Sequence, residues 1–366
     1  MIYTIPDYYR EFRCVAEQCQ DTCCAGWEIV VDKKSLKKYR KVKGSYRKMM
    51  LRSVNWLRGT FRQSKDKRCS FLKENNLCEM YMVLGRESLC RTCRLYPRHI
   101  EEFEGIREIS LSISCPEAAR LLLSKSEKTT FLSVEKEGEE EFPDFDLLLY
   151  SELADARDVI IKILQNRDLP VAVRTKLILG LAHDMQGRVN RGELFSCGEL
   201  FERYQGEGAR RFVESKIMEE IEDIQKRYEK AAALFGKLYE LELLREDWDK
   251  SLKEAEERLY WRGAGAYTSL REAFETWVRE KGNTWEVQKE QLLVYFIFTY
   301  FCGAVYDGKV YAKALFSVTN VFLMEEILMA RWAKNGGQLD SEDIEEIVYR
   351  YSREIEHSDK NLEKLL

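Results

Sequence analysis

The sequence LLVYFIFTYFCGAV occupies Leu292–Val305 and is the longest apolar stretch of the chain. Polar or small residues interrupt it at Tyr295, Thr299, Tyr300 and Gly303. The stretch is too short and too mixed to span a bilayer, so it predicts a helix that is buried in a protein core. It therefore indicates a mainly α-helical protein without a membrane-spanning segment.

The sequence around this stretch is also typical of helices. With five prolines, twenty glycines and 33% charged residues in 366 positions, the composition favours helices over a sandwich or barrel. Phe212–Leu259 fits either one long helix or a helical hairpin bent near Gly236. Apolar residues recur at three- and four-residue spacing in Leu147–Leu164, Val171–Met185, Phe212–Leu259, Leu270–Val278, Leu292–Phe301, Val318–Trp332 and Ile344–Ile355.

Cysteines are concentrated at the other end of the chain. We interpret the two late cysteines, Cys197 and Cys302, as core residues of helices. The N-terminal sequence has no basic segment followed by an apolar run, which predicts a cytoplasmic protein with reduced thiols. Nine of the eleven cysteines lie in the first third: Cys14, Cys19, Cys23, Cys24, Cys69, Cys78, Cys90, Cys93 and Cys115.

The spacing of these nine cysteines predicts a metal centre. One block runs from Cys14 to Cys24 and a second from Cys69 to Cys93, and short spacings let two thiolates of one loop reach one metal. Zinc and a four-iron cluster each need four thiolates, so the number of cysteines does not distinguish between them. Nine thiols exceed one such site, so either some are structural or there are two centres. Buried unligated cysteines and disulfides are the alternatives.

A radical mechanism is not predicted. Enzymes that cleave S-adenosylmethionine to a radical usually contain Cys-x3-Cys-x2-Cys. Cys19 and Cys23 supply the first half of that pattern, but its third position is Gly26.

The first third also contains short predicted elements. Ile2–Ile5 and Ile106–Ser114 are typical of strands, and a helix is expected to begin at Pro116. The acidic segment from Ser124 to Asp146 lacks apolar periodicity and is typical of a linker. We therefore predict a cysteine-rich domain over residues 1–125, an acidic linker over 126–146 and a multi-helix domain over 147–366.

One stretch is strongly basic. Lys33–Arg68 holds nine lysines and six arginines with Asp66 as its only acidic residue, and aromatic residues are interleaved. It predicts a basic helix-like segment over Ser35–Phe61. Such a stretch either binds an anionic partner, including nucleic acid, or is balanced by the acidic segment Glu135–Asp146.

Several motifs resemble a known family. The segments FRC, CSFL, CEMY and CRTCRLYPR, the last spanning Cys90–Arg98, resemble the CxxCxxCC (YkgJ-type) zinc- or iron-chelating domains. The segment SISCPEAARLLL at Ser112–Leu123, with the long helical remainder, is similar to the flagellin lysine-N-methylase (FliB) branch. The resemblance implies methyl transfer from S-adenosylmethionine to lysine side chains of flagellin, with a bound [4Fe–4S] cluster.

The catalytic residues stay unassigned at this level. The glycine pieces Gly206–Arg210 and Arg262–Tyr267 do not follow a predicted strand, so a doubly wound methyltransferase fold is not expected. Among the three histidines, His99 beside the second cysteine block is a better candidate than His183 for a ligand or proton carrier. A non-catalytic zinc- or iron-binding module and a zinc-containing nucleic-acid-binding protein are the alternative functions.

Overall fold

Helix α13 (Thr284–Tyr300) forms the centre of the helical part in the computed structural model, which describes every residue except 104, 138–145, 366 and the side chains of 221 and 222. It is apolar and buried on all sides, as expected of a helix inside a core. It packs against α5 (Pro116–Leu123), α6 (Leu147–Leu164) and α15 (Val310–Lys334). The buried helix predicted from Leu292–Val305 is confirmed, with its end at Tyr300.

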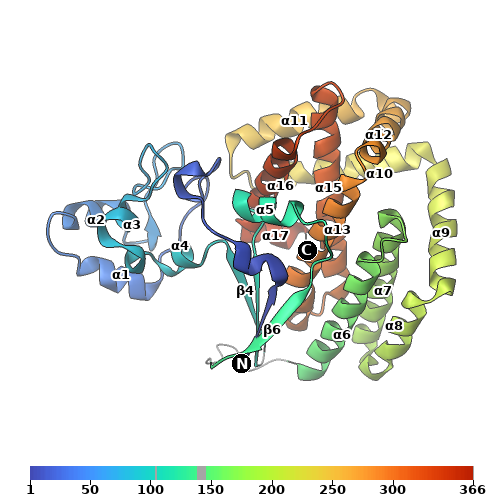
Figure 1. Cartoon of the computed structure of the whole chain (residues 1–366), viewed down its shortest axis with the longest axis horizontal. Helices are drawn as coiled ribbons and strands as arrows, with labels where there is room; N and C mark the ends of the chain where they lie inside the picture. The colour runs from blue at the N-terminus through green and yellow to red at the C-terminus, as the bar shows by residue number, and fades with distance from the viewer. Residues whose placement is uncertain (104, 138–145, 366) are drawn as a thin grey trace.

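The remaining helices surround α13 (Figure 1). The Phe212–Leu259 segment is neither one long helix nor a single hairpin, because it breaks at Asp223, between α9 and α10, and again after Gly236, where α10 ends. The bend expected near Gly236 is therefore present, but it is not the only break in the segment. In the described part of the chain, no helix combines the length and the apolar character needed to cross a membrane. The elements are α7 (Val171–Arg191), α8 (Cys197–Gln205), α9 (Glu207–Glu222), α10 (Ile224–Gly236), α11 (Glu246–Tyr260), α12 (Gly263–Glu280), α14 (Ala304–Asp307), α16 (Ser341–Glu356) and α17 (Asp359–Leu365).

A four-stranded sheet lies between these helices and the N-terminal module (Figure 1). Its order is β4-β5-β1-β6, with β1 parallel to β5 and the other neighbours antiparallel. The predicted strand at Ile2 and the helix at Pro116 are confirmed. The strand predicted over Ile106–Ser114 is also present, but it ends at Leu111. The strands are β1 (Ile2–Pro6), β4 (Arg98–Phe103), β5 (Ile106–Leu111) and β6 (Phe131–Glu135).

Strand β6 lies within the segment expected to be a linker. Its residues pair with β1 from Ile2↔Glu135 to Pro6↔Phe131. Phe131 stacks on Phe298 of α13 with the ring centroids 4.2 Å apart, and this contact anchors the strand to the core. The sequence pattern did not predict the strand because the neighbours of Phe131 are mostly polar. Residues 138–145 of this segment lie outside the described residues, and the predicted domain boundaries stay predictions.

The small module at the left of Figure 1 has a core of its own. Tyr39, Met50, Phe61 and Phe71 are buried in it. The prediction of one basic helix over Ser35–Phe61 is wrong, because Gly44 and Gly59 adopt left-handed conformations (φ 78° and 69°) that break the chain into shorter pieces. The elements are α1 (Lys33–Arg40), α2 (Arg47–Ser53), β2 (Val54–Asn55), β3 (Thr60–Phe61), α3 (Glu79–Leu84) and α4 (Arg91–Leu95).

Candidate functional site at the junction of the cysteine loop and helix α16

The nine clustered cysteines form two neighbouring groups that meet at Cys23 and Cys24. Five belong to the core of the small module, and we call them the module thiols: Cys24, Cys69, Cys78, Cys90 and Cys93. The other four influence one another electrostatically where the first cysteine loop meets the main core, and we call them the junction thiols: Cys14, Cys19, Cys23 and Cys115. All eleven cysteines of the chain are free thiols, and Cys197 and Cys302 are buried in the helical core as predicted.

Two adjacent pairs of thiols are poised for ionisation. A hydrogen bond from Cys23 lowers the pKa of the Cys24 thiol to about 7, and the pKa of Cys23 rises in turn. A hydrogen bond from Cys93 lowers the pKa of Cys90 in the same way. The thiolate is the form that binds metals, and in each pair one thiol has a lowered pKa.

The donor set fits zinc or an iron–sulfur cluster only in part. Thiols are the right ligand type, and there are five module thiols and four junction thiols. Among the described residues, however, no group of three or more His, Cys, Asp or Glu side chains is placed to hold a metal ion. The predicted metal role of the nine cysteines therefore stays a prediction, and no chemical step below is assigned to a metal.

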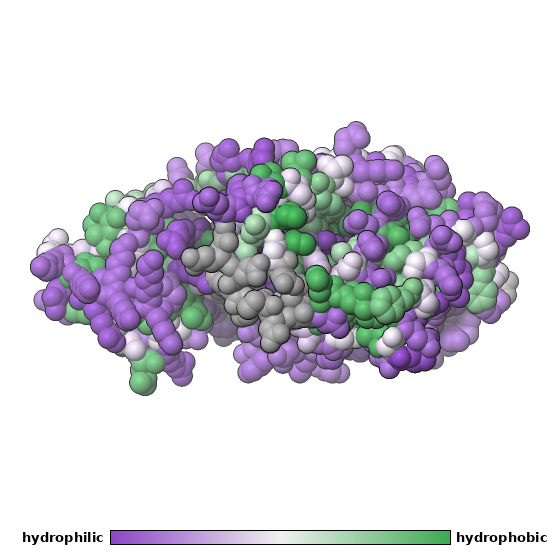
Figure 2. Space-filling model, turned by 90° about the horizontal axis from the view of Figure 1, so that it is seen from below, coloured by the Kyte–Doolittle hydropathy of each residue, from purple (hydrophilic) through white to green (hydrophobic). Residues whose placement is uncertain are grey.

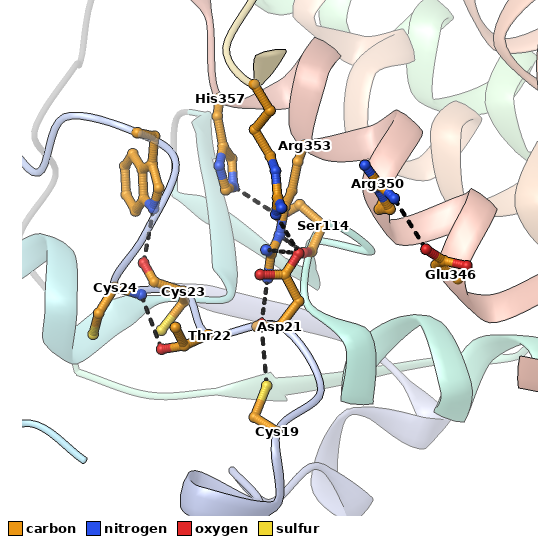
Figure 3. A network of polar contacts seen from close by, with 12 residues as sticks. Cys19, Asp21, Thr22, Cys23, Cys24, Ser114, Glu346, Arg350, Arg353 and His357 are labelled. Atoms are coloured by element: carbon orange, nitrogen blue, oxygen red, sulfur yellow. Dashed lines mark hydrogen bonds and ion pairs between the residues drawn. The ribbon is translucent and has the colours of Figure 1, made fainter. Parts of the chain in front are cut away.

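Arg353 of α16 fastens the first cysteine loop to the helical core (Figure 3). It is 4% exposed, and its guanidinium donates to the backbone oxygens of Ser114 and Asp21 at 2.8 and 2.7 Å. The Asp21 carboxylate lies 2.7 Å from Arg353 and 2.6 Å from Arg245. Because Asp21 lies between Cys19 and Cys23, these contacts fix the position of the loop that carries the junction thiols.

A chain of hydrogen bonds leads from this loop into the core. His357 Nε2 lies 2.9 Å from Ser114 Oγ, which lies 2.6 Å from Ser112 Oγ. Ser112 donates to the Glu356 carboxylate at 2.9 Å. The hydroxyls of Tyr295 and Tyr300 on α13 donate to the same carboxylate, at 2.8 and 3.1 Å. We call the set Ser112, Ser114, Tyr295, Tyr300, Glu356 and His357 the junction network.

Aromatic rings surround His357. Its ring centroid lies 4.6 Å from that of Trp27 and 5.7 Å from that of Tyr96. The Trp27 indole N–H donates to the Cys23 backbone oxygen at 2.8 Å. Burial, helped by the charge of Arg353, lowers the pKa of His357 to about 3, so its imidazole is neutral at physiological pH. The junction is therefore an aromatic region beside the thiols in which His357 is neutral and the Arg353 cation is paired with Asp21.

Residues of separate sequence motifs meet at this junction. Tyr96 belongs to the CRTCRLYPR segment, and Ser112, Ser114 and Cys115 belong to the SISCPEAARLLL segment. The sequence interpretation missed Arg353, Glu356 and His357. Their helix has a strongly amphipathic pattern, so its charged residues are typical of a solvent-facing side, and nothing in the pattern marks them as buried.

Of the two histidines singled out from the sequence, His99 borders the junction network and His183 lies apart from it. His99 of β4 contacts Glu101 at 2.7 Å and the ring of Tyr300 at 5.4 Å. His183 of α7 is on the surface with 73% of its side chain exposed. It lines a cleft of about 900 Å³ between α7, α8, α9 and α15, and a second cleft of about 500 Å³ lies between α12 and the end of α15. Neither cleft is lined by residues of the junction network.

The C-terminal part of the chain matches a known protein family. Residues 157–366 match the model of the FliB lysine N-methylase C-terminal domain. That region contains α16 and α13, which supply the helical side of the junction. The chain therefore belongs to the FliB lysine N-methylase family.

Named relatives match over a shorter region. The chain is 31% identical over 129 residues to the lysine-N-methylase of Salmonella typhimurium strain LT2, which covers 33% of this chain and 32% of that protein. It is 31% identical over the same length to the flagellar biosynthetic protein FliU of Salmonella muenchen, which covers 33% of this chain and 76% of that protein. The match thus spans about a third of the Salmonella lysine-N-methylase. No solved structure resembles this chain significantly.

Proposed function

We propose that this protein is a lysine N-methyltransferase that transfers a methyl group from S-adenosylmethionine to lysine side chains of flagellin. The observation that carries the proposal is the junction, where the two motifs of the first third meet α13 and α16 of the FliB C-terminal domain. A relative named lysine-N-methylase and one named as a flagellar biosynthetic protein support the reaction and the acceptor.

The reaction is an in-line displacement. The lone pair of the lysine nitrogen attacks the sulfonium methyl carbon, the sulfur–methyl bond breaks with its electrons going to sulfur, and S-adenosylhomocysteine leaves. The methylated ammonium then loses its extra proton to water. Only a neutral amine has the lone pair, so the site must favour the uncharged lysine by excluding water.

The junction suits the charges of this reaction. Trp27 and Tyr96 place aromatic rings beside the cysteine loop, and aromatic rings attract sulfonium and alkylammonium groups. A neutral His357 avoids repelling either cation. Glu356 accepts hydrogen bonds from two tyrosines and two serines, which fixes the position of its carboxylate. We assign the junction residues to binding and orientation.

We further propose that some of the nine clustered cysteines hold a [4Fe–4S] cluster, with zinc as the alternative. A cluster bound by thiolates colours the protein brown, whereas zinc leaves it colourless. The alternative function, a non-catalytic metal-binding module, shares this metal and differs in having no affinity for S-adenosylmethionine.

The test is a methylation assay on purified cognate flagellin, with metal analysis of the same anaerobically purified sample. We expect methyl-lysine in flagellin and S-adenosylhomocysteine as the co-product. Formation of 5′-deoxyadenosine would contradict the displacement mechanism. Absence of both methyl-lysine and S-adenosylmethionine binding in a folded, metal-loaded sample would contradict the function.

Two variants ask where the cofactor binds. His357→Ala changes the junction, and Phe212→Ala changes the 900 Å³ cleft, which is also lined by the aromatic rings of Tyr204 and Tyr311. We expect His357→Ala to weaken S-adenosylmethionine binding and Phe212→Ala to leave it unchanged. The opposite pattern would move the cofactor site to the cleft.

A further inference from the structure

One stretch of the small module, Lys33–Arg68, presents many basic side chains at the surface. Fourteen of the fifteen lysine and arginine side chains in Lys33–Arg68 are exposed. Figure 2 shows a mostly hydrophilic surface at the end of the molecule that this module forms. We call these fifteen cations the basic surface.

The described residues of the chain neutralise almost none of these charges. In the described part of the protein, the only ion pair made by the basic surface joins Arg58 to Glu28 at 3.9 Å. Glu135, Glu137 and Asp146, the described acidic residues of the segment predicted to balance it, make no ion pair with it. The basic surface is therefore available to an external anionic group.

The charge of the whole chain is strongly uneven. Fifteen basic residues and one acidic residue give Lys33–Arg68 a charge of +14, so the other 330 residues carry −18 for a total of −4. A single-sign surface of this size attracts an oppositely charged partner over a distance of about 10 Å, the Debye length at moderate salt.

The aromatic residues of the stretch are used inside the module. Tyr39, Tyr46 and Phe61 are at most 8% exposed, and the Arg40 guanidinium covers the Trp56 ring at 5.4 Å. Single-stranded nucleic acids are usually bound by stacking bases on exposed aromatic rings, and the stretch offers none that is fully open. A long polyanion would also extend from the basic surface toward the acidic remainder of the molecule. Both features favour a compact acidic protein surface over a nucleic acid.

We infer that the basic surface docks an acidic face of a protein partner and so holds that partner beside the junction. The identity of this partner as the methyl acceptor rests on the proposed function, but the docking itself does not. The module has its own packed core, so the cations are presented on a folded scaffold rather than on a loose tail.

The test removes four exposed cations that make no side-chain ion pair. The variant replaces Lys37, Lys41, Arg47 and Lys48 by Gln, and binding to purified cognate flagellin is measured at low and high salt without S-adenosylmethionine. We expect about a tenfold weaker affinity at low salt, mainly through slower association, and a shallower salt dependence. Methylation of a short lysine peptide should be unchanged.

A matched control separates a local surface from overall charge. It replaces Lys230, Lys237, Lys250 and Lys281 by Gln, four exposed lysines of the helical part that also lack described ion pairs. We expect the control to bind flagellin like the parent, with thermal unfolding of both variants near that of the parent.

Three results would overturn the inference: equal binding by the variant and the parent, equal loss in the control, or a clear preference of the parent for duplex DNA with a steep salt dependence. If flagellin does not bind but the lysine peptide is methylated, the docking inference fails and the proposed function stands. If flagellin binds but no methyl group is transferred, the docking inference stands and the proposed function fails.

Discussion

At the residue scale, Arg353 joins the cysteine loop to the helical core through one ion pair and two hydrogen bonds to backbone oxygens. Replacing it by Gln leaves Asp21 with only Arg245 and removes two hydrogen bonds to backbone oxygens. Breaking a buried ion pair costs about 3 kcal/mol or more, so we expect a loss of this size in the free energy of unfolding from urea titration. Arg211→Gln, which breaks an exposed pair with Glu207, is the control and should cost under about 0.5 kcal/mol. Equal losses would contradict the role of Arg353.

Glu354, the neighbour of Arg353, predicts a pH dependence of stability. Burial raises the pKa of its carboxyl to about 7, although the Leu244 amide donates to it at 2.9 Å. The native state therefore holds a proton that the unfolded chain releases near its ordinary pKa, and stability falls as the pH rises between those two values. Removing this carboxyl should reduce the decrease in the free energy of unfolding with rising pH by about 3 kcal/mol at most. We expect Glu354→Gln to be less sensitive than the parent when urea titrations at about pH 5 and pH 8 are compared; an unchanged difference would exclude Glu354 as the cause.

At the element scale, the sequence predicted elements whose apolar pattern is local. Helix α13 and strands β1 and β5 follow directly from their apolar residues. Strand β6 was missed because only Phe131 is anchored in the core, and its other side chains face solvent. The convergence at Ser114 was also invisible, because it depends on α16, which begins more than 200 residues later in the chain. Long-range packing of this kind has no local sequence signal.

The module thiols make a prediction about their own part of the fold. If they hold a metal, Cys93→Ser should lower the metal content and loosen the small module, because metal binding and folding are linked. Cys197→Ser, a buried thiol of α8, should leave the metal content unchanged. The measurements are metal analysis and the rate of proteolysis within residues 24–95. Metal loss in Cys197→Ser alone would reverse the assignment.

At the scale of the whole molecule, the buried apolar residues form two cores. The small module has its own core, but Leu111, Ile113, Ala118 and Leu122 pack into the main core with the helices. The Glu108 carboxylate on β5 also pairs with Arg157 of α6 at 2.5 Å. The second half of the first 125 residues thus contributes directly to the core of the helical part.

This packing predicts how fragments behave. A fragment of residues 147–366 loses those four side chains. Burial of each large apolar side chain contributes about 1.5–3 kcal/mol to the free energy of unfolding, and burial of alanine contributes less. The summed loss is comparable to the total stability of a typical domain. We expect it to bind a hydrophobic dye and to unfold without a cooperative transition. A fragment that begins at residue 98 keeps β4, β5 and α5 and should be distinctly more stable in the same thermal scan. Cooperative unfolding of the 147–366 fragment at the temperature of the full chain would instead support a domain boundary near residue 125.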